Sequence, residues 1–235
     1  MKEAYARYLL DKTQSDYNKI ADQFAKTRKE VWFGLDFLFQ DLKKGERILD
    51  LGCGNGRLYQ IFKKKEVVYQ GVDFSESLIK IAKEQYPEAD FQKGDALMLP
   101  FKDNTFDKIY SLAVFHHIPS AGLRRKFLLE AKRILKKNGK LIITVWDLKS
   151  FSKAKPLILY YFFKKIFFCS FLDFGDIFYP WKNGRGETII NRYFHLFSLK
   201  ELKTIAKQAG FFIEAAGLIN NNKELNNFYL IGRKI

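Results

Sequence analysis

Three glycines alternate with other residues at Gly52, Gly54 and Gly56, directly after the apolar run Ile48–Leu51. Glycine adopts tight backbone conformations and lets the main chain approach a ligand, so a glycine turn between a strand and a helix is a nucleotide-binding corner. The spacing is one residue shorter than the dinucleotide fingerprint G-x-G-x-x-G. Asp50 also stands two positions before the first glycine, where a carboxylate suits an ammonium group better than a diphosphate. Cys53, inside the turn, is interpreted as a small turn residue and not as a nucleophile.

Two more carboxylates follow the next predicted strands. Asp73 closes the segment QGVDFS, where a carboxylate can accept hydrogen bonds from two ribose hydroxyls. Asp95, in GDALMLP, could accept a hydrogen bond from an exocyclic amine. A single aspartate at a strand end commonly caps a loop. Three of them at the carboxyl ends of successive parallel strands converge on the crevice where such sheets bind ligands, so the pattern indicates a nucleoside site.

Together these residues resemble the class I S-adenosylmethionine-dependent methyltransferases over about Ile48–Trp146. The segments that carry the resemblance are DLGCGNG (Asp50–Gly56), VDFS (Val72–Ser75), GDALMLPF (Gly94–Phe101), FDKIYS (Phe106–Ser111) and LKKNGKLIITVW (Leu135–Trp146). The resemblance implies an enzyme that uses S-adenosyl-L-methionine, with Gly52 and Gly54 along the methionine part, Asp73 on the ribose and Asp95-Ala96 at the adenine. The expected cofactor set also includes Tyr17, Arg28, Asp50, Phe74 and Ser111.

The flanking segments resemble a narrower family, the tRNA wobble-uridine 5-carboxymethyl methyltransferases, including the methyltransferase domain that in animals is fused to an AlkB-type oxygenase. The matching segments are Thr27-Arg28, Ala113–His117 (AVFHH), Pro180-Trp181-Lys182 and Arg192-Tyr193-Phe194-His195. The chain departs from the family at Val31, where the family has proline before the tryptophan that is Trp32 here, and at Phe194, where it has tyrosine. The resemblance implies the anticodon loop of a tRNA as substrate, and relatives often work with a small zinc-ribbon activator protein.

Esterification of a carboxymethyl group uses an acceptor that is already ionised at neutral pH and needs orientation, not a general base. Arginine suits this task because its planar fork binds a carboxylate through two hydrogen bonds and stays charged. The candidate catalytic residues are Arg28, His117, Arg192 and His195, and the candidate substrate residues are Trp181, Lys182 and Tyr193. Arg28 could equally hold the cofactor's own carboxylate, and Trp181 could stack on an exposed base. Structural roles remain as alternatives: a strand end for His117, an edge strand for Arg192 and His195, and core packing for Trp181.

The elements that must position these residues alternate between strands and helices. Expected strands are 47–51, 67–72, a short one at Phe91, 106–112 and 140–146, and expected helices are 56–64, 75–85 and 121–135. Two helical segments are also expected within 16–41, and a turn is expected at Asn138-Gly139. The capping box Ser198–Glu201 predicts the start of another helix. Strands 211–219 and 227–233, joined by a polar turn at 220–222, are expected to close the fold as an antiparallel hairpin. Alternation predicts an α/β fold with a doubly wound, mostly parallel sheet, and the resemblance implies seven Rossmann-like strands with the last antiparallel.

We expect one domain over residues 1–235, with 1–45 as helices over the cofactor site and 182–235 as substrate-side strands and helix. The aromatic-rich insert between them, 151–181, holds 12 of the chain's 39 aromatic residues. Its apolar runs, 157–163 and 166–172, predict a helical hairpin that packs on the core. A lid, a protein interface, or an in-plane membrane contact through 151–178 remain as alternatives.

Composition narrows the class of protein. The content of 47% hydrophobic and 29% charged residues is typical of a globular chain, and no apolar run is long enough to span a membrane. The first residues lack a secretory signal, and Cys53 and Cys169 give neither a disulfide framework nor metal-ligand spacing, which favours the cytoplasm. A net charge of +15 favours an anionic partner such as tRNA. The alternatives are a small-molecule or lipid-quinone methyltransferase near a membrane surface, and a non-catalytic cofactor-binding activator of a partner protein.

Overall fold

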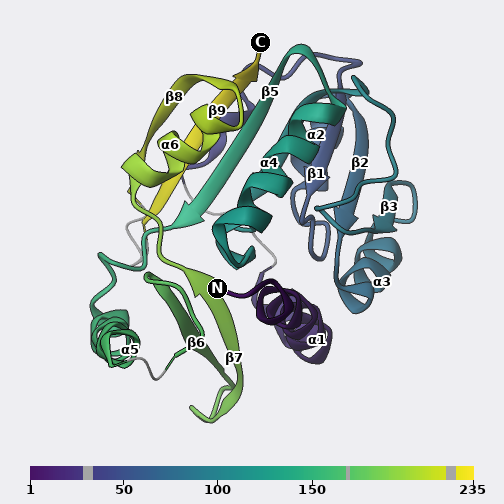
Figure 1. The fold of residues 1–235 in the computed structure, drawn as a ribbon. Coiled ribbons are helices and arrows are strands. Elements are labelled where there is room, and N and C mark those ends of the chain that lie inside the picture. Colours follow the sequence, from purple (N-terminus) through teal and green to yellow (C-terminus); the bar gives the residue numbers. More distant parts are fainter. Residues whose placement is uncertain (29–33, 168–169, 221–225) are drawn as a thin grey trace.

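The computed structural model describes residues 1–28, 34–167, 170–220 and 226–235. Val31, Trp32, Cys169 and positions 221–222 of the predicted polar turn therefore lie outside the described residues. Figure 1 shows a central twisted sheet with helices on its faces, and with helix α1 and the β6–β7 ribbon beyond the carboxyl ends of the parallel strands.

Seven strands form the main sheet in the order β3-β2-β1-β4-β5-β9-β8. The strands are β1 (Arg47–Leu51), β2 (Val68–Asp73), β3 (Asp90–Lys93), β4 (Phe106–Leu112), β5 (Leu135–Trp146), β8 (Phe211–Ile219) and β9 (Asn227–Lys234). β1 to β5 pair in parallel, and β9 pairs antiparallel with both β5 and β8. The predicted fold class is thus confirmed, and the strand order reverses on the two sides of β1, which is where such sheets bind ligands.

Helices cover both faces of this sheet. They are α2 (Tyr59–Lys64), α3 (Glu76–Gln85), α4 (Ala121–Ile134) and α6 (Leu199–Gln208). The hydroxyls of Ser75 and Ser198 accept backbone hydrogen bonds at the first turns of α3 and α6, as capping residues do. Neighbouring strand residues alternate between two cores: Leu49, Ile109 and Ile143 lie in one, and Ile48, Tyr110 and Ile142 in the other. Burial on both sides explains why these strands read as continuous apolar runs.

The N-terminal part differs from the sequence prediction. Helix α1 spans Glu3–Thr27, so it begins well before Asp16. The second predicted helical segment is wrong over its described part, which contains only the short 3-10 helix η1 (Asp36–Phe39). Gly34, with φ of +81°, has a left-handed conformation that a continuous α-helix cannot include. The predicted turn at Asn138-Gly139 lies within β5, where Asn138 has φ of +63°.

The aromatic-rich insert also differs from the prediction. Its first apolar run forms helix α5 (Lys155–Ile166), after the short 3-10 helix η3 (Ser152–Ala154). The second half of the predicted helical hairpin is wrong, because the described residues 170–175 are not helical and Gly175 has φ of +84°. The chain continues into β6 (Asp176–Lys182) and β7 (Thr188–His195), which pair antiparallel as a separate two-stranded sheet. None of the helices in the described ranges is long and apolar enough to cross a membrane.

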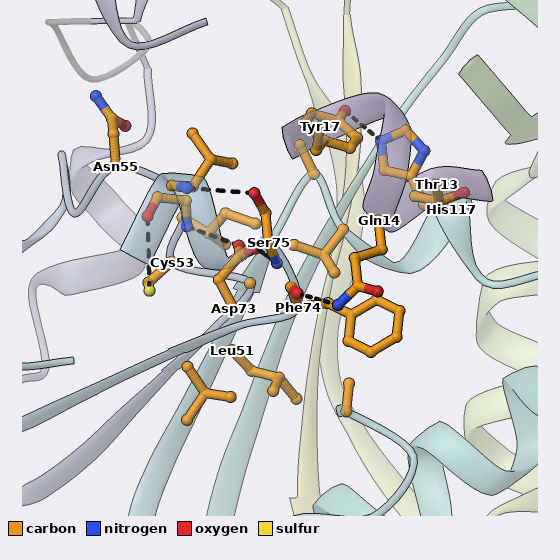
Figure 2. A pocket seen from close by; sticks show the side chains of 18 of the residues that line it. Thr13, Gln14, Tyr17, Leu51, Cys53, Asn55, Asp73, Phe74, Ser75 and His117 are labelled. Atoms are coloured by element: carbon orange, nitrogen blue, oxygen red, sulfur yellow. Dashed lines mark hydrogen bonds between the residues drawn. The ribbon is translucent and has the colours of Figure 1, made fainter. Parts of the chain in front are cut away.

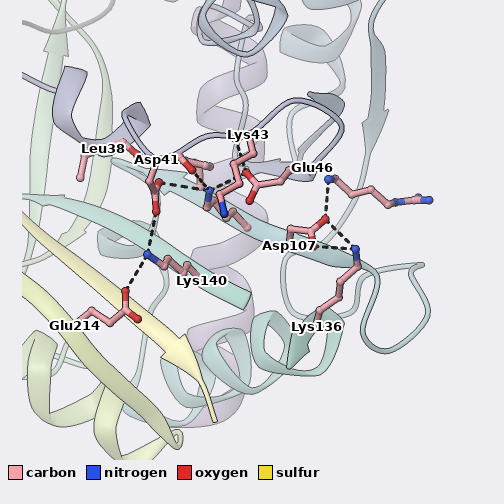
Figure 3. A network of polar contacts seen from close by, with 11 residues as sticks. Leu38, Asp41, Lys43, Glu46, Asp107, Lys136, Lys140 and Glu214 are labelled. Carbon is pink, nitrogen blue, oxygen red and sulfur yellow. Dashed lines mark hydrogen bonds and ion pairs between the residues drawn. The ribbon is translucent and has the colours of Figure 1, made fainter. Parts of the chain in front are cut away.

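A polar network closes the opposite end of the sheet, away from the glycine turn (Figure 3). Lys108, on β4, is buried and donates to Oε2 of Glu46 at 2.7 Å and to the carbonyl of Asp41 at 2.6 Å. Lys140, on β5, bridges the carboxylates of Asp41 and Glu214. The network ties the segment before β1 to three strands, and so stabilises the end of the sheet opposite the glycine turn.

Candidate active site

A pocket lies at the carboxyl ends of β1, β2, β3 and β4, and α1 forms its opposite wall (Figure 2). The residues from the sequence-predicted set that line it are Tyr17, Arg28, Gly52, Gly54, Asp73, Phe74, Asp95, Ala96, His117 and Arg192. They come from α1 and its C-terminal cap, from the carboxyl ends of β1, β2, β3 and β4, and from β7. The fold therefore brings together residues that lie up to 175 positions apart in the chain.

The glycine turn packs tightly beneath the pocket. Gly52 has φ of +84°, and a Cβ added there would lie 2.2 Å from Cγ2 of Val114. The amides of Gly52 and Cys53 both donate to the carbonyl of Val72, at 2.7 and 3.0 Å, which holds the turn against β2. Burial raises the pKa of the Cys53 thiol, so this side chain is a neutral turn residue at physiological pH.

Asp73 lies between the glycine turn and the start of α3. Its Oδ2 accepts from the Gly54 amide and its Oδ1 from the Ser75 amide, each at 2.8 Å. Burial raises the pKa of Asp73, and the hydrogen bonds from these amides oppose that shift. Each carboxylate oxygen keeps a second lone pair, so Asp73 can also accept from two neighbouring hydroxyls of a ligand.

The structure places Asp50 and Ser111 behind the pocket and not in its lining. Asp50 is buried and accepts a 3.0 Å hydrogen bond from the Tyr69 hydroxyl. Burial raises the pKa of Asp50 to about 7, despite this bond and the nearby charge of Arg57. Ser111, on β4, is fully buried. Both residues support the strands that carry the pocket.

These groups fit S-adenosyl-L-methionine, whose ribose carries a diol and whose methionine part carries an ammonium and a carboxylate. Asp73 offers acceptors for the diol. Asn55, within the glycine turn, has a buried Oδ1 with no partner in the described structure, and this oxygen suits an ammonium group. Arg28, at the pocket wall, suits the carboxylate.

Tyr17 and His117 meet across the pocket through a 2.8 Å hydrogen bond between the hydroxyl and Nε2 (Figure 2). His117 Nδ1 lies 2.8 Å from the carbonyl of Tyr193, which can only accept, so Nδ1 carries the proton. Burial lowers the pKa of His117 to about 3, so the ring is neutral and Nε2 accepts from Tyr17. Both ring nitrogens of His117 therefore make hydrogen bonds within the protein, and the bond at Nε2 positions the Tyr17 hydroxyl.

Two arginines lie beside Trp181 at the pocket. The Cζ of Arg192 is 4.9 Å from the Trp181 ring centre, and that of Arg28 is 5.5 Å from it. Arg192 is buried, and its Nε has no hydrogen-bond partner among the described atoms. Burial and the charge of Arg192 lower the pKa of Arg28. In the described part of the chain neither guanidinium pairs with a carboxylate, and a guanidinium can bind a carboxylate through two hydrogen bonds.

The remaining candidates lie elsewhere. His195 is buried and lies 2.7 Å from both Asp176 and Glu201, so it joins β6, β7 and α6. Burial alone would lower its pKa, but the hydrogen bonds to the two carboxylates raise it. Tyr193 is buried in the core between α1 and β7, and Lys182 is exposed at the end of β6. The structure does not bring these three side chains to the pocket lining. Trp181 does not line the pocket either, but it contacts Arg28 and Arg192, which do.

Sequence reasoning missed several pocket residues. Thr13 and Gln14 line the pocket one turn before Tyr17, and Gln14 donates to the carbonyl of Phe74 at 2.7 Å. Their helical spacing from Tyr17 could have identified them, had α1 been extended to Glu3. Arg57, whose pKa burial lowers to about 10, and Trp146, at the end of β5, also line the pocket.

A family model of the methyltransferase domain matches residues 49–143. A protein of Encephalitozoon cuniculi named "Putative methyltransferase" is 30% identical over 197 residues, which are 83% of this chain and 84% of that protein. The tRNA (carboxymethyluridine(34)-5-O)-methyltransferase of Schizosaccharomyces pombe is 27% identical over 93% of this chain and 94% of its own length. The corresponding enzyme of Xenopus tropicalis is 37% identical over 57% of this chain, and the chain spans only 20% of its length.

Solved structures share the fold at lower identity. A Methanosarcina mazei protein described as a SAM-dependent methyltransferase superposes with a TM-score of 0.67 at 22% identity, over 85% of this chain and 97% of its own. A chain from the complex with the Trm112 methyltransferase activator of Haloferax volcanii superposes with a TM-score of 0.66 at 16% identity, over 94% and 97% of the two chains. At these identities the likeness concerns the fold.

Proposed function

The chain belongs to the class I S-adenosylmethionine-dependent methyltransferases, and on that premise we propose that it esterifies the carboxymethyl group of a wobble uridine in tRNA. The observation that carries the proposal is the pair of arginines, Arg28 and Arg192, beside Trp181 at the cofactor pocket. The names of the Schizosaccharomyces and Xenopus relatives support the same acceptor.

The reaction is a single displacement. S-adenosyl-L-methionine, held by Asp73 and the glycine turn, would supply an electrophilic methyl group for transfer to the acceptor carboxylate. No proton moves, because the acceptor is already ionised. A neutral His117 whose two nitrogens are both engaged is compatible with this chemistry, since no general base is required.

The residues of this chain contribute mainly by positioning. We assign Arg192 to the acceptor carboxylate, because its buried guanidinium has an unsatisfied Nε and lies against Trp181. Holding two reactants close and in line can lower a barrier by about 7–11 kcal/mol at best. Arg28 serves either the acceptor or the carboxylate of the cofactor. Asp73 is assigned to the ribose, Asp95-Ala96 to the adenine, and Gly52 and Gly54 to the methionine part.

Two further observations support tRNA as the substrate: the positive net charge of the chain, and an aromatic ring that could receive a base from the exposed anticodon loop. A net charge of +15 favours a polyanion, and Trp181 presents a ring near the two arginines on which a splayed base could stack. We propose the cytoplasm as the compartment. A small zinc-ribbon activator is proposed as a partner, by analogy with the Haloferax complex.

The test is incubation of the chain, alone and with a zinc-ribbon activator, with labelled S-adenosylmethionine and tRNA that carries unesterified carboxymethyluridine. We expect label in a single nucleoside at the wobble position, identified by mass analysis. A methyl ester is cleaved by mild alkali, so this label must be released by such treatment, whereas methyl groups on ring atoms or ribose would stay. Label found only in lipids or small metabolites would refute the tRNA assignment. Cofactor binding with no methyl transfer to any fraction would favour a non-catalytic activator.

A further inference from the structure

Helix α5 presents apolar side chains to solvent along its length. None of its side chains, all of which the structure describes, is buried. Together with the loop after it, α5 forms what we call the α5 aromatic surface: Leu159, Tyr160, Phe162, Phe163, Phe171 and Phe174, each between 47% and 73% exposed. One side of α5 packs on the protein through Leu157, Ile158 and Tyr161, as the sequence predicts. The exposed apolar side chains on its other side mark a contact surface.

The α5 aromatic surface is continuous with the start of α1. The rings of Phe162 and Phe174 lie 6.2 Å apart, which joins the helix to the loop. The ring of Phe171 lies 5.7 Å from Tyr5, and Tyr5 stacks on the exposed Tyr8. Figure 1 shows α5 at the edge of the molecule beside β6. None of these rings lines the cofactor pocket, so the surface is separate from the candidate active site.

Lysines surround the rings of α5, and the acidic residue nearest to these rings in the chain is Asp173, between Phe171 and Phe174. The chain has five lysines and no Asp or Glu between Leu148 and Leu172: Lys149, Lys153, Lys155, Lys164 and Lys165. The Nζ of Lys164 lies 5.6 Å from the Tyr160 ring centre, and that of Lys165 6.0 Å from that of Phe174. The nearest following acids are engaged, since Asp173 pairs with the N-terminal amino group and Asp176 with His195.

We propose that the α5 aromatic surface rests on an anionic lipid bilayer, with its rings in the headgroup region and its lysines on the lipid phosphates and carboxylates. Rings and aliphatic side chains edged by lysine are the pattern of in-plane membrane helices. A second copy of the chain is a poor occupant, because a symmetric contact would bring the lysines of both copies together without carboxylates to neutralise them. Protein interface cores are depleted in lysine. Single-stranded RNA is also a poor occupant, because bases stack on aromatic rings and an exposed aliphatic side chain such as Leu159 offers them no ring.

The test is flotation of the full chain with vesicles of phosphatidylcholine alone or with added phosphatidylserine. We expect binding to the anionic vesicles, weakened by salt. The double variant Phe162→Ser/Phe171→Ser should lower the partition coefficient by at least about tenfold, because two apolar rings no longer enter the bilayer. Lys164→Glu/Lys165→Glu should remove the preference for phosphatidylserine. The matched control is Phe212→Ser, a half-exposed ring on β8, which should bind as the wild type does.

Unfolding temperature and affinity for adenosylhomocysteine, measured on each variant, show that the fold is intact. A wild-type chain that does not float, or a Phe162→Ser/Phe171→Ser variant that floats like wild type, overturns the proposal. Two other outcomes also overturn it. One is a wild-type dimer in sedimentation equilibrium that the aromatic variant abolishes. The other is a loss of tRNA retention in the aromatic variant with vesicle binding unchanged, which would make the surface an RNA platform.

Discussion

The hydroxyl of Tyr17 and Nε2 of His117, one hundred positions apart in the chain, lie 2.8 Å apart and join α1 to the segment after β4. The bond requires a neutral imidazole whose proton is on Nδ1, because the carbonyl of Tyr193 occupies that side. The protonation state of one buried histidine is thereby linked to the helix that forms the opposite wall of the pocket.

The pH dependence of stability tests this arrangement. The folded-state pKa of His117 is about 3, below the ordinary value of 6.5, so the unfolded chain binds more protons as pH falls. His117 therefore stabilises the fold above about pH 6.5, and this contribution is lost as pH falls toward 3, by about 1.4 kcal/mol per unit. Replacing His117→Gln should make the free energy of unfolding less dependent on pH over that range, as measured by urea denaturation at several pH values.

His195 supplies the matched control, because its shift has the opposite sign. The carboxylates of Asp176 and Glu201 raise its folded-state pKa above 6.5, so its contribution is present at low pH and is lost as pH rises through that folded-state value. His195→Gln should therefore steepen the loss of stability on acidification. Identical pH profiles for the two variants would contradict both protonation assignments.

Replacing Asp73→Ala removes the acceptor of the Gly54 and Ser75 amides together with the proposed ribose contact. We expect the Kd for adenosylhomocysteine, measured by calorimetry, to rise by about 100-fold or more. The control is Asp90→Ala, an exposed carboxylate on β3 that accepts from the Gln70 side chain away from the pocket. A Kd for Asp73→Ala within about twofold of wild type would remove this residue from the cofactor site.

Replacing Arg192→Ala should separate the acceptor from the cofactor. The guanidinium lies against Trp181 and its Nε has no hydrogen-bond partner in the described ranges, so the substitution removes a charge that could bind an incoming anion. We expect turnover to fall by about 100-fold with the Kd for adenosylhomocysteine within about threefold of wild type. Arg192→Lys should recover little, because a point charge does not reproduce a two-bond fork.

Arg185→Ala, at the exposed turn between β6 and β7, is the charge-matched control and should leave turnover unchanged. Retained turnover in Arg192→Ala would place the acceptor carboxylate on another residue.

The glycine turn makes a steric prediction. Gly52→Ala places a Cβ 2.2 Å from Cγ2 of Val114 at a φ of +84°, whereas Gly45→Ala, at φ +79°, meets nothing within 4 Å. Gly45→Ala should therefore cost about 1–2 kcal/mol of unfolding free energy from backbone strain alone. Gly52→Ala should cost more, and Gly52→Ala/Val114→Ala should recover part of the difference. Equal costs for Gly45→Ala and Gly52→Ala would show that the turn yields and does not pack tightly.

Substitutions in the polar network at the far end of the sheet should lower the free energy of unfolding without changing the affinity for adenosylhomocysteine. Lys108→Ala leaves the partly exposed carboxylate of Glu46 without its 2.7 Å partner, although the Lys43 amide still donates to it, and we expect a cost of about 1–3 kcal/mol. Lys140→Ala, at a more exposed ion pair, should cost at most about 1 kcal/mol. Affinity for adenosylhomocysteine should be unchanged in both; a lower affinity in Lys108→Ala would mean that the two ends of the sheet are coupled.

Local pattern was enough to predict the sheet and its ligand-binding edge. Apolar runs such as Ile48–Leu51 and Phe106–Leu112 are buried on both faces, so their strands could be recognised without tertiary information. The order of Gly52, Asp73 and Asp95 along the chain placed them at successive strand ends, and parallel strands end on one edge of a sheet. The helix predicted from the second apolar run of the insert, 166–172, was wrong, because a short apolar segment is compatible with a helix, a strand or a loop.

By itself, then, the sequence determined the fold class, the family and the edge of the sheet where the cofactor pocket lies, because these depend on short-range periodicity and on strand order. Tertiary structure alone decided which arginines meet Trp181, which nitrogen of His117 carries the proton, and that His195 pairs with Asp176 and Glu201 away from the pocket. Those relationships depend on side chains from distant segments that pack within a few ångströms, and on the burial that follows. No pattern within one segment encodes them.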